Sequence, residues 1–85
     1  MRRSIDDHPF SPEELPPDDE DVQQLSWAVA ISDDYEDGEP RVVLTLEEVG
    51  RAGAGLVLHM LPEHVRRLRV ALRDGLAEIG AEPGP

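Results

Sequence analysis

The stretch that most constrains the fold is Leu56–Gly80, in which a short apolar run ends at a proline and an amphipathic pattern begins at once. Apolar residues then recur at spacings of three and four, which places them on one stripe of a helix: Val65, Leu68, Leu72, Leu76 and Ile79. Pro62 suits a first helical position and Gly80 a C-terminal stop. The pattern predicts a strand at Leu56–Met60 followed by a helix over residues 62–80.

Two more strands are expected upstream, at Leu25–Ser32 and Arg41–Leu46, because apolar and small or polar residues alternate in both. Asp37-Gly38 is the expected tip of the turn between them. A two-residue turn there would pair Ile31 with Leu44, and a wider loop in the same phase is equally acceptable. The predicted class is α+β: a three-stranded antiparallel meander followed by one C-terminal amphipathic helix (β-β-β-α).

Residues 1–22 are rich in Pro, Asp and Glu and have neither a helical nor a strand period. We expect this acidic arm to be disordered, residues 23–80 to form the small domain, and residues 81–85 to fray. Ser11-Pro12-Glu13-Glu14 has the pattern of a short helix start. Phe10 and Leu15 flank that turn and are candidate docking anchors, although two incidental apolar residues in a solvated tail are the more ordinary interpretation.

The net charge of −11 is unevenly distributed, with −6 in residues 1–22 and −5 in residues 33–39, whereas the helix carries +1. This distribution disfavours nucleic acid as a partner and favours a basic protein surface. All eight basic residues are arginine, a bias typical of GC-rich bacterial genomes. No apolar run reaches a membrane span and no secretory signal is recognisable, so a cytoplasmic protein is expected.

The chain lacks cysteine, which excludes a disulfide, a thiol nucleophile and a zinc-thiolate site. No nucleophile and base stand at a spacing that suggests a triad, so we expect no enzyme and no cofactor. The acidic loop 33–39 departs from the calcium-loop pattern, and the glycines of 50–55 fit no phosphate loop. His59 and His64 flank the strand-to-helix junction, but their expected directions make convergence on a metal improbable.

Two surfaces are candidates for partner binding. The first is the polar face of the helix, which carries Arg66, Arg67, Arg69 and Arg73, although a solvated basic face is the more ordinary interpretation. The second is the outer sheet face, small and fairly apolar, with Val43, Val57 and His59. One helix covers one face of a sheet, so we expect a homodimer through the outer face, the edge strand or the helix near Gly75.

The sequence therefore predicts a small protein-binding accessory or regulatory module, homodimeric, that presents an acidic surface to a basic partner. One alternative is an antitoxin or immunity-type inhibitor of a partner protein. An alternative from another class is a metal- or small-ligand-binding domain that uses His59 and His64.

Overall fold

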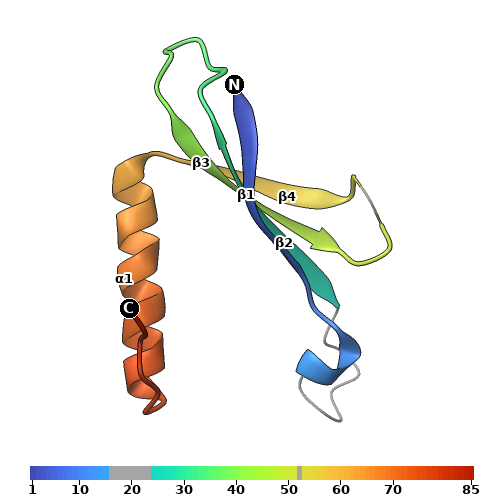
Figure 1. Ribbon diagram of the computed structural model, residues 1–85, viewed down its shortest axis with the longest axis vertical. Coiled ribbons are helices and arrows are strands. Elements are labelled where there is room, and N and C mark those ends of the chain that lie inside the picture. The colour runs from blue at the N-terminus through green and yellow to red at the C-terminus, as the bar shows by residue number, and fades with distance from the viewer. Residues whose placement is uncertain (16–23, 52) are drawn as a thin grey trace.

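The computed structural model describes residues 1–15, 24–51 and 53–85. Over these residues the chain forms a four-stranded antiparallel sheet and a C-terminal helix (Figure 1). The elements follow the chain as β1 (Arg2–Pro9), β2 (Leu25–Ser32), β3 (Arg41–Glu48), β4 (Gly55–Met60) and α1 (Pro62–Glu78). The strand order β1-β2-β3-β4 is a simple meander. The α+β class with one C-terminal helix is confirmed, but the predicted count of three strands is wrong.

The fourth strand is β1, and it comes from the arm that was expected to be disordered. It pairs antiparallel with β2, from Arg2 opposite Ser32 to Pro9 opposite Ser26. The pairing shifts at Ile5, which is the extra residue of a β-bulge. A 3₁₀ turn at Pro12–Glu14 follows, as the helix-start pattern predicted. Residues 16–22 of the expected arm lie outside the described residues.

The register of the central strands keeps the predicted phase but not the tight turn. Ile31 pairs with Val42 rather than Leu44, which is a register shift of two residues. The last paired residues before the loop are Ser32 and Arg41, so eight residues connect the strands and the two-residue turn is wrong. Its tip closes with the Gly38 N–H donating to the Tyr35 carbonyl at 2.9 Å. The β3–β4 pairing places Met60, Leu58 and Leu56 opposite residues 42, 44 and 46, on the same sheet face.

Helix α1 begins at Pro62 as predicted and ends at Glu78, two residues before the predicted stop at Gly80. Pro62 is its first residue, and the Leu61 N–H donates to Nδ1 of His64 at 3.3 Å in the absence of a capping side chain. At the other end Gly80 has φ +76°, a left-handed conformation that glycine adopts without strain. The Gly80 N–H donates to the Ala77 carbonyl at 3.1 Å and the Ala81 N–H to that of Leu76 at 2.9 Å. These two bonds form a Schellman motif.

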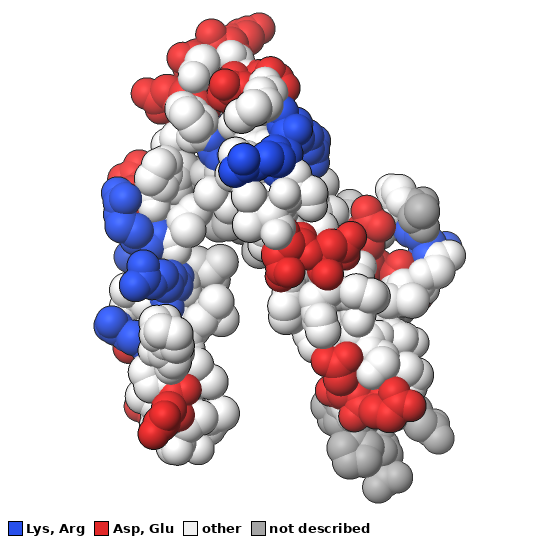
Figure 2. Space-filling model, viewed as in Figure 1, with Lys and Arg blue, Asp and Glu red and all other residues white. Residues whose placement is uncertain are grey.

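The helix packs on the sheet only near its first turns. It contacts β3 and β4 alone among the strands, and the two limbs then diverge (Figures 1 and 2). Across the described residues, the buried apolar side chains are Val43, 1% exposed, and Met60, 5% exposed. No α1 residue is buried. No helix of the described chain has the length and apolar character needed to cross a bilayer.

Candidate functional site

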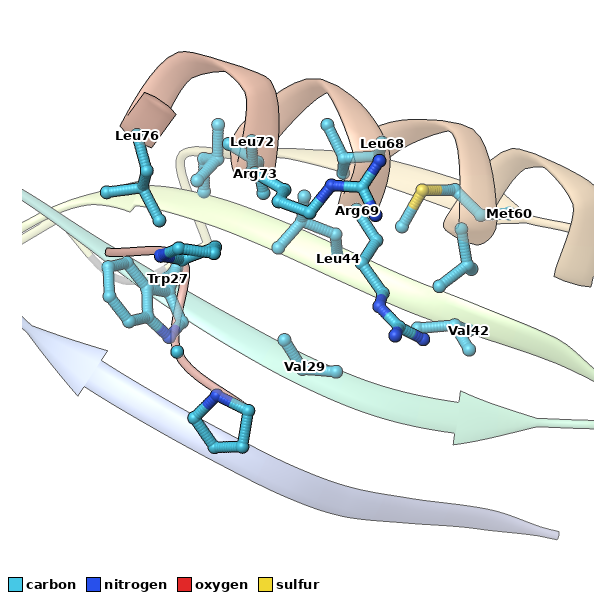
Figure 3. Close-up of a pocket in the computed structure, with 15 residues that line it drawn as sticks. Trp27, Val29, Val42, Leu44, Met60, Leu68, Arg69, Leu72, Arg73 and Leu76 are labelled. Carbon is cyan, nitrogen blue, oxygen red and sulfur yellow. The ribbon is translucent and has the colours of Figure 1, made fainter. Parts of the chain in front are cut away.

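An apolar groove of about 810 Å³ separates α1 from the sheet (Figure 3). The sheet wall comes from alternate residues of β2 and β3 and the end of β4: Trp27, Val29, Val42, Leu44, Leu46 and Met60. The helix wall is the predicted stripe without Ile79: Val65, Leu68, Leu72 and Leu76. The C-terminal residues Pro83–Pro85 also reach the groove. The face that was expected to be covered by the helix is therefore open over much of its length.

Arginines supply the charge in this groove. Arg69 and Arg73 stand on its helix side, and with Arg66 and Val70 they also line a shallow hollow of about 160 Å³ on the outside of α1. Figure 2 shows arginine side chains running along the helix limb. Arg67 is exposed but lies about 100° around the helix from Arg66. The structure thus brings three of the four predicted arginines onto one face.

The acidic loop 33–40 is held in a defined shape by Arg41. Its guanidinium donates to both carboxylate oxygens of Asp37, at 2.7 and 3.0 Å, and lies 4.5 Å from the centre of the Tyr35 ring. This bidentate bond, with a second from the Glu39 N–H, lowers the pKa of Asp37 to about 2. The Met1 ammonium contacts Asp33 at 2.5 Å and lowers the pKa of that carboxyl.

The loop also covers part of the outer sheet face. The Tyr35 hydroxyl is 2.8 Å from Nδ1 of His59, and the two rings meet edge to face. His59 is the cross-strand neighbour of Val43, which explains why a side chain on the supposedly uncovered face is the most buried of the described core. Val57, by contrast, is half-exposed on the edge strand β4.

An aromatic cluster at the other end of the sheet ties the N-terminal segment to β2. The Trp27 ring lies 4.6 Å from that of His8 and 5.0 Å from that of Phe10, centre to centre. The Phe10 N–H donates to the Leu25 carbonyl at 3.0 Å. Leu15 is half-buried at the end of the 3₁₀ turn. Phe10 thus has a role inside this chain, whereas nothing ties Leu15 to a particular partner.

Glu14 fastens the turn to this cluster. Its carboxylate accepts the Ser11 N–H at 3.1 Å and lies 3.0 Å from Nε2 of His8. These bonds, led by that from the Ser11 backbone, lower the pKa of Glu14. Sequence reasoning missed Asp6 and His8 as partners of Trp27, because a polar strand gives no alternation that would mark it.

The histidines considered for a metal site are engaged separately. Nδ1 of His59 faces Tyr35, and Nδ1 of His64 accepts the Leu61 N–H. In the described ranges no three side chains of His, Asp or Glu gather in a geometry that could hold a metal ion.

Comparison of the chain with protein-family models, curated proteins and solved structures finds no significant match.

Proposed function

We propose that this chain is a small homodimeric protein-binding module that presents an acidic surface to a basic partner protein. The observation that carries the proposal is the position of the loop 33–40, which projects at the end of the molecule with its carboxylates outward (Figure 2). Glu36 and Glu39 are exposed and have no ion-pair partner among the described residues. Exposed carboxylates of one sign attract and orient a basic surface during encounter.

The shape of the loop supports binding rather than general solvation. Its tip is closed by a backbone hydrogen bond, and side-chain contacts fix Asp37 to Arg41 and Tyr35 to His59. A loop held in this way loses little conformational freedom when a partner binds, which reduces the entropic cost of association.

The chemistry of the groove supports binding rather than catalysis. Its charged side chains, Arg69 and Arg73, are both cations, and the remaining lining residues are apolar or small. General acid–base catalysis needs a group that takes up and releases a proton near neutral pH, and arginine does not.

The test is capture of partners from native lysate by the full chain, at low and at 0.5 M salt, followed by mass spectrometry. A Glu36→Gln/Glu39→Gln variant removes the two unpaired charges. The matched control, Glu78→Gln/Glu82→Gln, makes the same charge change at the foot of the helix limb. We expect a basic protein to be captured at low salt by the wild type and the control and to be lost from the loop variant. Equal capture by all three chains contradicts the proposal.

A further inference from the structure

The single chain is far more open than a protein of its size that folds alone. Its radius of gyration is 15.1 Å, whereas a compact chain of this length has about 12 Å. Its accessible surface is 6934 Å², about 1900 Å² more than the roughly 5000 Å² expected for a monomer of this mass. A permanent dimer buries on the order of 1000–2500 Å² on each partner, so the excess has the size of one such interface.

Large apolar side chains are exposed on the helix and on the sheet, in the groove and beside it. On the helix, Leu72 is 63% and Ile79 78% exposed; on the sheet, Leu56 is 78% and Leu58 53% exposed. Leu56, Leu58 and Ile79 lie outside the groove lining itself. A small molecule seated in the groove would leave them bare, and the lining offers few polar groups to orient one.

We infer that the groove is filled by helix α1 of a second copy of this chain, in a reciprocal dimer. In this arrangement the apolar stripe of each α1 packs on the inner sheet face of the partner chain, around Leu46. The inference rests on the homodimeric part of the proposed function and specifies its interface.

Lengths and charges agree with this occupant. The 17 residues of α1 and the eight of β3 both span about 26 Å, so one helix can cover the length of the sheet. Arg69 and Arg73 lie beside the apolar stripe of α1, so a second α1 in the groove brings these two cations to the inner sheet face, where carboxylates are also placed. The strand register places Asp6 on the inner face beside Val29, and Glu48 on the same face beyond Leu46. The same patch serves both chains, which is what a two-fold dimer requires.

Sedimentation equilibrium from 1 to 500 µM, with helicity followed by circular dichroism, tests the dimer. We expect the wild type to be dimeric. The Leu72→Asp variant should still be monomeric at a concentration at least tenfold above the one at which the wild type dimerises. Val70→Asp is the matched control, because Val70 is exposed on the same helix but lies with Arg66 on its outer side. It should remain dimeric with unchanged helicity. If Leu72→Asp fails to fold, Leu72→Ser replaces it with the same expectation.

Cross-linking tests the placement, since the chain has no cysteine of its own. Two single-cysteine chains, Leu46→Cys and Leu72→Cys, are mixed under mild oxidation. We expect a disulfide-linked pair that contains one chain of each kind, whereas Leu46→Cys with Val70→Cys should give none.

Three results would overturn the inference: a wild type that is monomeric throughout, a dimer unaffected by Leu72→Asp, or cross-linking through Val57→Cys on the edge of β4 in place of the Leu46–Leu72 pair. A monomer that carries a small apolar molecule in native mass spectrometry also overturns it.

The proposed function is tested separately. If the monomeric Leu72→Asp chain still captures the basic partner, the groove is the dimer interface and the acidic loop binds independently. If the protein is dimeric but the Glu36→Gln/Glu39→Gln variant captures partners as well as the wild type does, the proposed function is contradicted and the dimer inference stands.

Discussion

The indole Nε1 of Trp27 donates a hydrogen bond to the carboxylate of Asp6 at 2.8 Å, and this bond joins the strongly patterned β2 to the polar strand β1. The rings of His8 and Phe10 contact the same indole, His8 at a tilt and Phe10 edge to face. One side chain of the predicted domain thus organises the strand that sequence patterns did not reveal.

We expect Asp6→Ala to lower the free energy of unfolding by about 1 kcal/mol, since one hydrogen bond to a charged group near the surface is lost. Asp7→Ala is the control, because Asp7 pairs with Ala28 and its carboxylate has no hydrogen-bond partner among the described residues. Urea unfolding followed by circular dichroism at fixed protein concentration measures both. Equal losses in the two variants would assign the effect to net charge instead.

Gly75, inside α1, and Gly80, just past its end, should respond to alanine with opposite changes in the free energy of unfolding. Gly80→Ala forces a side chain into the left-handed conformation and should lower the free energy of unfolding by about 1–2 kcal/mol. Gly75→Ala should stabilise by up to about 1 kcal/mol, because Gly75 lies inside the helix and a Cβ there would meet no atom within 4 Å in this chain. Thermal unfolding of the two variants decides between this account and a general intolerance of substitution.

The Asp37–Arg41 pair predicts a defined acid response. The pKa of Asp37 is lowered from 3.8 to about 2 in the folded chain, so the ionised form favours folding. This contribution is fully present above pH 4 and is lost as the pH falls through about 2. Carboxyl NMR titration should find Asp37 well below its ordinary pKa, and Arg41→Gln should return it toward 3.8. An unchanged titration in that variant would contradict the assigned cause.

Tyr35→Phe should lower the free energy of unfolding by about 1 kcal/mol, because it removes the hydroxyl bonded to His59. The variant keeps the ring beneath Arg41. Tyr35→Ala should cost more and should speed hydrogen exchange at Val43, since the ring itself is lost. Hydrogen exchange of β3 is the measurement. If Val43 exchanges equally fast in both variants, the ring does not protect the outer face.

Local sequence patterns predicted an element correctly where one of its faces is apolar and where residues such as proline or glycine mark its ends. Strand β2 occupies Leu25–Ser32 as predicted, and α1 starts at Pro62 and stops before Gly80. Strand β1 escaped detection because its residues are mostly polar and its bulge at Ile5 breaks the period of two. Its attachment depends on contacts with Trp27, about twenty residues away, which no local window contains.

The candidate surfaces were predicted less completely than the fold. Helical spacing predicted one polar face with Arg66, Arg67, Arg69 and Arg73, and the structure brings all of these but Arg67 together. The burial of Val43 depends on how the loop folds back through Tyr35 and His59, which composition does not encode. An amphipathic stripe indicates which side of α1 is apolar but not how closely that side approaches its own sheet, so the open groove could not be foreseen.

The two edge strands of the sheet, β1 and β4, differ in how readily a strand from another chain can pair with them. Along β1, charged side chains and a bulge make a poor template for another strand. Along β4, Leu56, Val57 and Leu58 are exposed in a regular strand with no charge to repel an incoming chain. A strand from any other chain can therefore add at one border only. If two copies pair β4 to β4, both permissive borders are used, so we expect such an addition to end after one step.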